Sequence, residues 1–276
     1  MISKSSFAVL LMILFCSSTA FALNPSRTYK QKPDKFNLKF EQKEVKTNDG
    51  AATLKVWHIA SKKKTTNVVL IAHNGEGNMG DHLDRAVALS DTFNVVMFDY
   101  RGYGESSEFE IDNNMYVYPH FQDDMASMID HVRKTHSNRF SLYGWGIGGG
   151  LALGVGFGRV ETRAIVADTP FLSMEDLEER FSSWDEPMEV PFAGYERRYE
   201  PETALANGPG KHLEAVGLIV GSNDKVMKKA DMVKLKNLQK KLVKGVYVVE
   251  NPDRKDNFRT DKAAYTAKLK SWLAPK

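Results

Sequence analysis

Cysteine is nearly absent from this chain, because its 276 residues contain only one, Cys16. A lone cysteine cannot form a disulfide within the chain, which excludes a fold held together by such bonds. An excess of charge is also missing: 38 basic residues are nearly balanced by 35 acidic ones, and the formal net charge is +3. There is then no bulk electrostatic attraction to nucleic acid, and we expect no nucleic-acid partner.

Long apolar runs are lacking as well. The N-terminal run from Phe7 to Phe15 is too short to span a bilayer comfortably. Lys4 precedes this run and Ala20-Phe21-Ala22 follows it, the pattern of a secretory signal with a small-x-small cleavage site. We therefore expect residues 1–22 to be a signal peptide, and the mature protein, starting near Leu23, to have no transmembrane span.

The expected signal is short and ends in alanine, which is typical of bacterial export to the periplasm or the extracellular space. Cys16 lies inside the removed segment, so the exported chain would carry neither a disulfide nor a thiol. A lipoprotein lipidated at Cys16 is the alternative, and the bulky Phe15 just before that cysteine disfavours it.

The chain after this signal has the pattern of one domain, residues 36–276, preceded by a polar, proline-containing segment, residues 23–35, that predicts a flexible leader. The segments Phe36–Val45 and Thr53–Ile59 alternate apolar and polar residues and predict antiparallel edge strands. From Val68 onward strands alternate with helical stretches, which we expect at Asp81–Leu89, Phe121–Arg133, Gly149–Phe157, Asp231–Leu242 and Asp261–Leu273. This alternation predicts an α/β fold with a mostly parallel central sheet and helices on both faces.

A serine is missing from the centre of the most informative motif, Gly144-Trp145-Gly146-Ile147-Gly148. It matches the nucleophile elbow Gly-x-Ser-x-Gly, a sharp strand-to-helix turn that raises the serine oxygen toward the substrate, except that glycine replaces the serine. A strand-type run, Phe140 to Tyr143, precedes the motif, and a pattern typical of a buried helix follows Gly148. An ordinary glycine-rich turn is the alternative for the motif taken alone.

Four other segments accompany this motif in order along the chain: Val68–Gly75, Asn94–Ser106, Asp168–Phe171 and Leu218–Val226. Together they closely resemble the α/β-hydrolase family, in particular its small serine hydrolases with a minimal lid, over roughly Ala52 to Leu273. The run Asp99-Tyr100-Arg101-Gly102-Tyr103-Gly104-Glu105-Ser106 is the most specific piece. The resemblance implies an α/β-hydrolase fold with a short lid insertion at about residues 173–212, above the carboxyl ends of the strands. An aromatic-rich connection packed on the core is the alternative for that insertion.

The resemblance places the family's catalytic nucleophile, acid and histidine on Gly146, Asp224 and Lys255. No histidine follows His212, so a shifted alignment does not recover one. The oxyanion donors would fall on Gly75 and Ile147. The family's His-Gly pair in the oxyanion loop is here His73-Asn74, so this loop also departs from the pattern.

These replacements remove the chemistry of a serine triad, which needs an oxygen nucleophile, a base that titrates near neutrality and an acid that orients the base. Gly146 has no side chain. Lysine, with an ordinary pKa of about 10.4, is a cation at neutral pH unless burial lowers that value strongly. Lys255 would then pair with Asp224 or remain solvated, and the sequence leaves both open. We therefore expect no catalytic residue.

The former cleft would be lined by a small set of side chains: His73, Asn74, Glu76, Trp145 and Trp184. An ordinary hydrogen-bonded loop is the alternative for His73 and Glu76.

A second motif, Gly75-Glu76-Gly77-Asn78-Met79-Gly80, fits the dinucleotide-binding pattern Gly-x-Gly-x-x-Gly, with Asp99 at the right distance to bind a ribose. Three residues separate its first glycine from the preceding strand, however, and the hydrolase resemblance already accounts for Asp99. Asp81, His82 and Asp84 adjoin at a helix start but point to different faces, and Asp81 is better explained as a helix cap. We therefore expect neither a cofactor nor a metal.

Two functions remain open. The first is an exported α/β-hydrolase-like protein that lacks serine-hydrolase activity and binds a small acyl or peptidic molecule, or another protein. The second is an esterase-like or peptidase-like hydrolase that uses other groups, such as water activated by Asp224 or Glu76. Either carboxylate needs a raised pKa to act as a base near neutrality.

Overall fold

The computed structural model describes residues 23–184, 187–251 and 256–274. The expected signal peptide with Cys16, and Lys255 at the histidine-equivalent position, lie outside the described residues.

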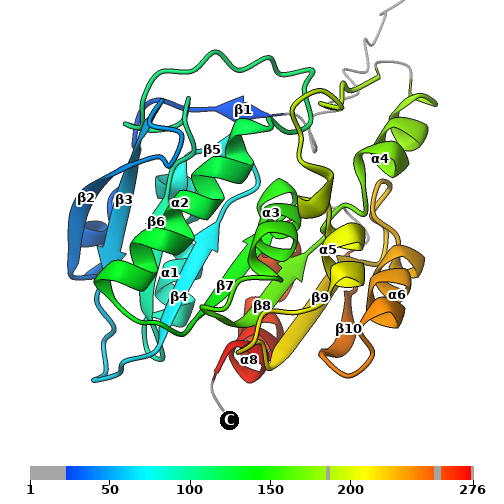
Figure 1. The fold of residues 1–276 in the computed structure, drawn as a ribbon. Helices are drawn as coiled ribbons and strands as arrows, with labels where there is room; N and C mark the ends of the chain where they lie inside the picture. The colour runs from blue at the N-terminus through cyan, green and yellow to red at the C-terminus, as the bar shows by residue number, and fades with distance from the viewer. Residues whose placement is uncertain (1–22, 185–186, 252–255, 275–276) are drawn as a thin grey trace, which may run out of the picture.

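A single eight-stranded sheet forms the centre of the molecule, with the strand order β10-β9-β8-β7-β4-β6-β3-β2 (Figure 1). Its strands are β2 (Phe40–Lys46), β3 (Thr53–Ile59), β4 (Val68–Ala72), β6 (Asn94–Phe98), β7 (Phe140–Trp145), β8 (Thr162–Asp168), β9 (Ala215–Gly221) and β10 (Val243–Val249). Only the pairings of β2 with β3 and of β3 with β6 are antiparallel. The predicted mostly parallel sheet with antiparallel strands at one edge is confirmed.

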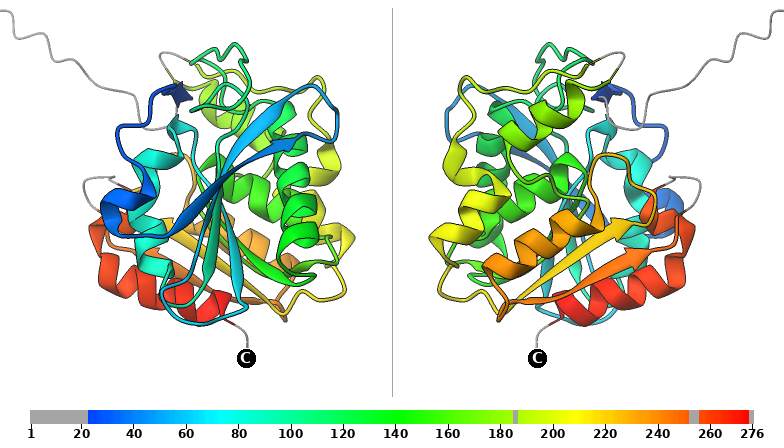
Figure 2. Two further views of the ribbon diagram at one scale, coloured as in Figure 1. Left: turned by 90° about the vertical axis from the view of Figure 1, so that its left-hand side faces the viewer. Right: turned by 90° about the vertical axis from the view of Figure 1, so that its right-hand side faces the viewer.

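Strands β4, β7, β8 and β9 are buried along their whole lengths, because helices cover both faces of the sheet (Figure 2). One face packs against α2 (His120–Thr135), α3 (Ile147–Gly156), α5 (Pro201–Asn207) and α6 (Lys229–Leu238). The other packs against α1 (Leu83–Leu89), α7 (Asn257–Thr260) and α8 (Lys262–Leu273). Two separate apolar clusters result, one on each side of the sheet, as expected for a parallel sheet buried on both faces.

The connection from β8 to β9 contains the segment expected as a lid. It holds α4 (Met174–Phe181), a 3-10 helix at Arg197–Tyr199, and α5. Ser173 caps α4 by accepting a hydrogen bond from the Asp176 N–H at 3.1 Å. The guanidinium of Arg180 on α4 donates to both carboxylate oxygens of Asp231 at 2.9 Å, which ties this connection to α6.

Residues 23–35 pack on the domain, which differs from the flexible leader that their composition predicts. Strand β1 (Asn24–Pro25) pairs in parallel with the short strand β5 (Glu76–Gly77). The Leu23 side chain is fully buried, and a 3-10 helix follows at Pro33–Phe36. The physical reason is that Leu23 is buried and that the N–H groups of Asn24 and Ser26 bond to the glycine-rich loop. Such isolated contacts give no periodic signal in the sequence.

We expect Gly154→Ala on α3 to lower the free energy of unfolding by about 1–3 kcal/mol, because an added methyl group would overpack the contact between α3 and the lid connection. A Cβ at Gly154 would lie 1.8 Å from the Tyr199 carbonyl oxygen, a backbone atom that cannot rotate away. Urea denaturation measures the change.

The matched control is Gly158→Ala, where a Cβ would meet nothing within 4 Å. This variant should be as stable as the wild type or slightly more stable, since alanine restricts the unfolded chain. Equal stability of the two variants would contradict the packing argument.

Candidate functional site

Gly146 forms the turn between β7 and α3 with a φ of 55° and a ψ of −128°. Residues other than glycine rarely adopt this positive φ, and a nucleophile elbow strains its central residue in this way. The Gly146 N–H donates to the Asp168 carbonyl oxygen at 3.0 Å, which holds the turn against the end of β8. The following Gly148 allows close packing, since a Cβ there would lie 2.2 Å from the Ala72 carbonyl oxygen. The backbone of an elbow is therefore present without a side chain at its apex.

Asn74 borders the apex of this turn. A Cβ built on Gly146 would lie 3.0 Å from the Asn74 Cβ, tighter than ordinary side-chain contacts. The Asn74 side chain is half-buried, and its Oδ1 accepts a long hydrogen bond from the Glu76 N–H at 3.4 Å. A side chain at position 146 would need Asn74 to move, so the two residues together shape the space at the apex.

His73 is fully buried at the end of β4, and burial holds the pKa of its imidazole well below the usual range. Its Nδ1 accepts a hydrogen bond from the Gly75 N–H at 3.1 Å, so the neutral ring carries its proton on Nε2. That nitrogen lies 3.6 Å from Oδ1 of Asp99. His73 therefore supports the loop from inside the protein, in agreement with the hydrogen-bonded-loop alternative.

Gly75 was expected to supply an oxyanion donor. In the structure its N–H instead donates a hydrogen bond to Nδ1 of His73. Ile147 occupies the first turn of α3, where backbone N–H groups have no partner within the helix. The side chains of Leu23 and Ile147 both lie close to Gly75: a Cβ on Gly75 would be 2.6 Å from Leu23 Cδ2 and 3.0 Å from Ile147 Cδ1. A buried apolar side chain from the N-terminal segment thus lies beside Gly75, one of the two residues expected to form the oxyanion site.

Asp99, at the end of β6, accepts hydrogen bonds on both carboxylate oxygens. The Met79 N–H donates to Oδ1 at 2.7 Å, and the Tyr29 hydroxyl donates to Oδ2 at 2.5 Å. Burial raises the pKa of Asp99 to about 7. The carboxylate that the dinucleotide hypothesis assigned to a ribose is thus bound by the chain's own groups. The glycine-rich loop before Met79 pairs with β1.

Asp224 follows β9, as the resemblance implies for the family's acid. Its Oδ1 accepts from the Val226 and Met227 N–H groups at 2.9 and 2.8 Å, which closes a tight turn. Burial raises the pKa of this half-buried carboxylate. Arg180 donates to the Val226 carbonyl oxygen, so the lid connection reaches the same turn. Pairing of Asp224 with Lys255 involves a residue outside the described ranges and stays a prediction.

Asp168 was part of a quoted motif but was not predicted to belong to the site. Its carboxylate accepts from Nδ2 of Asn257 at 2.7 Å and from the Tyr265 hydroxyl at 2.6 Å. Burial raises the pKa of Asp168 to about 7. Asn251 donates in turn to Oδ1 of Asn257 at 2.8 Å. These bonds anchor the residues on either side of 252–255 to the end of β8, beside the elbow.

Arg85 on α1 also went unpredicted. Its guanidinium binds both carboxylate oxygens of Asp256 at 2.6 and 2.7 Å, and its Nε donates to the Tyr143 hydroxyl at 3.2 Å. The guanidinium lies 3.8 Å from the ring centroid of Trp145, and the Trp145 side chain is buried. A lone arginine in an apolar helix carries no recognisable signal in the sequence, because its partner lies far along the chain.

The five side chains expected to line the cleft do not form one lining. His73 and Trp145 are buried, whereas Glu76 is exposed. Asn74 borders the apex, and Trp184 is half-buried against the Phe181 ring, with centroids 4.9 Å apart. Of the predicted set, Trp145 directly precedes Gly146 in the chain, and Asn74 lies beside it in space, 3.0 Å from a Cβ built on that glycine.

The residues at the start of α1 have structural partners. Asn78, rather than the expected Asp81, is the cap, and Oδ2 of Asp81 accepts from the Asn78 N–H at 3.2 Å. Asp84 accepts from Arg259 at 2.9 Å. Across the described residues, no three histidine, cysteine or acidic side chains are grouped to hold a metal.

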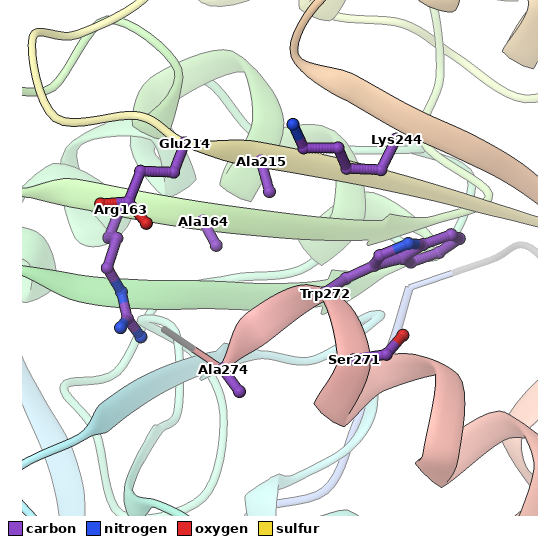
Figure 3. Close-up of a pocket in the computed structure, with 8 residues that line it drawn as sticks. All are labelled: Arg163, Ala164, Glu214, Ala215, Lys244, Ser271, Trp272 and Ala274. Carbon is purple, nitrogen blue, oxygen red and sulfur yellow. The ribbon is translucent and has the colours of Figure 1, made fainter. Parts of the chain in front are cut away.

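A pocket lies at the opposite edge of the sheet. It is lined by Arg163, Ala215 and Lys244 near the starts of three strands and by Trp272 at the end of α8, as Figure 3 shows. Since Gly146 follows the end of β7, this pocket is remote from the elbow.

Solved structures match this architecture closely. The esterase Pf2001 of Pyrococcus furiosus superposes with a TM-score of 0.69 at 19% identity, over 92% of this chain and 98% of that one. The acylaminoacyl peptidase of Pyrococcus horikoshii superposes with a TM-score of 0.59 at 14% identity, over 87% of this chain and 42% of that one. This chain has the α/β-hydrolase fold.

Sequence comparison finds relatives over part of the chain. The uncharacterized protein YfhR of Escherichia coli (strain K12) is 30% identical over 179 residues, 60% of this chain and 58% of that protein. The match thus spans less than two thirds of that relative. No family model matches the chain. Within the described ranges, none of the helices has the length and apolar character needed to cross a bilayer.

We expect His82→Gln to flatten the acid side of the stability profile. Burial lowers the pKa of His82 to about 4, and its Nε2–H donates to the Glu76 carbonyl oxygen at 2.8 Å. Below the ordinary pKa of 6.5, the unfolded chain binds a proton that the folded chain refuses, so stability falls as the pH falls. Between pH 7 and pH 5 this group should cost about 2 kcal/mol.

Denaturant unfolding at both pH values measures the effect, and the glutamine variant, which keeps a donor for the carbonyl, should lose correspondingly less. Parallel pH profiles for the two proteins would show that His82 is protonated in the folded state or exposed to solvent.

Proposed function

We propose that this protein is a hydrolase-like protein without a serine-triad mechanism, and that it acts by binding a ligand near the elbow. The observation that carries the proposal is the backbone of Gly146, which has the φ and ψ of an elbow but no oxygen to attack with. A triad without its nucleophile retains only the weak acceleration that the oxyanion site and substrate binding provide.

The surrounding residues support the same conclusion. Asn74 borders the apex, and the Gly75 N–H is bonded to His73 rather than free to stabilise an oxyanion. No histidine follows His212, so the loop after the last strand supplies no imidazole. Nucleophile, base and oxyanion donor therefore depart from the serine-hydrolase pattern together.

The fold suggests where the ligand binds and what kind it is. Open α/β sheets bind ligands at the carboxyl ends of their strands, the edge at which Gly146 and the lid connection lie. The structural neighbours include an esterase and an acylaminoacyl peptidase, whose names denote action on acyl compounds. We propose a small acyl or peptidic molecule as the ligand, and residues 1–22 as a signal that exports the protein to the periplasm or the extracellular space.

A hydrolase that uses Asp224 as a general base is the second candidate. Burial raises the pKa of Asp224, which moves this carboxylate toward the range of a working base. Its Oδ1, however, already accepts two backbone hydrogen bonds that close the turn. If the wild type hydrolyses p-nitrophenyl acetate, Asp224→Asn separates the two candidates, because only an Asp224-dependent enzyme would lose that activity.

We expect the wild type to remain unlabelled by a fluorophosphonate probe, and the triple variant Asn74→Gly, Gly146→Ser, Lys255→His to gain labelling at residue 146. The triple variant should hydrolyse p-nitrophenyl acetate at least tenfold faster than Gly146→Ser alone, because nucleophile and base act as a unit. Asn74→Gly is included because a Cβ at position 146 would lie 3.0 Å from the Asn74 Cβ.

The double variant Gly146→Ser, Lys255→His is the matched control for the role of Asn74, and it should fall below the triple variant. Labelling of any serine in the wild type would contradict the proposed function. A triple variant that folds but gains nothing would show that position 146 is not in an elbow able to hold a nucleophile.

A further inference from the structure

The N-terminal strap, residues 23–31, crosses the glycine-rich loop beside the elbow (Figure 1). Neither the serine-hydrolase pattern nor the proposed function assigns it a role. Four of its nine residues are exposed, Leu23 is buried, and the other four, Tyr29 among them, are half-buried. What it covers is the edge of the loop that departs from the family pattern.

The strap is recognised mainly through its backbone. The Asn24 N–H donates to the Gly75 carbonyl oxygen at 2.9 Å, and the Ser26 N–H donates to the Gly77 carbonyl oxygen at 2.8 Å. Pro25 lies between them, at the alternate position whose N–H would point away from β5, so its missing donor costs nothing. This is how an extended peptide adds to a sheet edge.

Groups of the domain also donate to carbonyl oxygens of the strap backbone. The Gly104 N–H donates to the Ser26 carbonyl oxygen at 3.0 Å. Nδ2 of Asn78 donates to the Ser26 and Thr28 carbonyl oxygens at 3.1 and 2.9 Å. The Asn78 side chain is fully buried, and both hydrogen bonds that its Nδ2 donates go to backbone carbonyl oxygens of the strap.

Two side chains of the strap fill defined places. Leu23 is fully buried, and its Cδ2 would lie 2.6 Å from a Cβ built on Gly75, in the loop beside the elbow. The Tyr29 hydroxyl donates to Oδ2 of Asp99 at 2.5 Å. Side chains of the strap therefore contribute at two positions, Leu23 and, six residues later, Tyr29. The other contacts described are made by its backbone, so they place little demand on its sequence.

The strand pairing between the strap and the loop is short. Only two residue pairs form the parallel contact between β1 and β5, and a two-stranded contact of this length is marginal by itself. The strap is also covalently tethered, so it competes with any ligand from a high effective concentration. These features fit a segment that occupies a site and can be displaced from it.

We infer that the strap fills, in the same molecule, a binding site for an extended peptide with an apolar residue next to the elbow. This inference rests on the proposed binding function and specifies its ligand as a peptide held by β-strand addition along Gly75–Gly77. The bound peptide replaces the strap, and the strap keeps the site covered in the absence of ligand.

The test uses the full chain and a fluorescein-labelled synthetic peptide of residues 23–31, followed by fluorescence anisotropy. In the released variant, Leu23→Ser with Tyr29→Phe, the tethered competitor is weakened, so the peptide should bind at least tenfold more tightly than it binds the wild type. A peptide carrying the same two substitutions is the matched control and should bind the released variant at least tenfold more weakly.

A locked variant tests the same site without weakening the strap. Asn24 and Glu76 are exposed register partners, so Asn24→Cys with Glu76→Cys in a Cys16→Ser background can form a disulfide across β1 and β5. The oxidised protein should not bind the peptide, and reduction should return its affinity to the wild-type level. The two single-cysteine proteins are the controls for the disulfide.

Equal peptide affinity in the released, wild-type and oxidised locked proteins would overturn the inference. Mass spectrometry of the peptide after incubation separates this failure from failure of the proposed function. A cleaved peptide would contradict the binding-only function. An intact peptide that binds the released, wild-type and oxidised locked proteins equally well would contradict the inference alone. If the released variant does not fold, as judged by circular dichroism, the oxidised and reduced locked proteins still decide the question.

Discussion

The hydrogen bond from the Gly146 N–H to the Asp168 carbonyl oxygen is the constraint on which the rest of the site depends. It fixes the sharp turn from β7 into α3, while the carboxylate of the same Asp168 binds Asn257 and Tyr265. One residue at the end of β8 thus joins the elbow, through its backbone, to the two C-terminal helices, through its side chain. Because this residue is buried, solvent does not compete for either set of bonds.

A second set of interactions is organised around the loop between β4 and α1. His73 supports the loop from inside the protein, and the Tyr100 and Tyr103 hydroxyl groups donate to the His73 and Gly75 carbonyl oxygens at 3.1 and 3.0 Å. The outer edge of the loop faces the N-terminal strap. Tyrosine hydroxyl groups bind the carbonyl oxygens of the loop on its inner side, whereas the N-terminal strap binds its outer side. The outer side is therefore held by a segment from a distant part of the sequence, and the inner side by residues of the central sheet and its loops.

The sequence predicted the sheet, its antiparallel edge, the helices on both faces and the position of Gly146, because these depend on apolar periodicity and on a local motif. It did not predict the packing of residues 23–35, the bond that removes the Gly75 N–H from an oxyanion role, or the Arg85–Asp256 ion pair. Each of these joins residues far apart in the chain through one or two polar contacts. Such contacts have no period, and short polar segments that pack look the same in sequence as those that do not.

The position of Asn74 also limits which side chains fit at residue 146. The Cβ of a serine at residue 146 would lie 3.0 Å from the Asn74 Cβ. The positive φ of the turn also disfavours any side chain there. Any side chain at residue 146 is thus opposed both by Asn74 and by the backbone conformation. Residues 74 and 146 therefore shape this turn as a pair, and a larger residue at one position is accommodated best when the other is small.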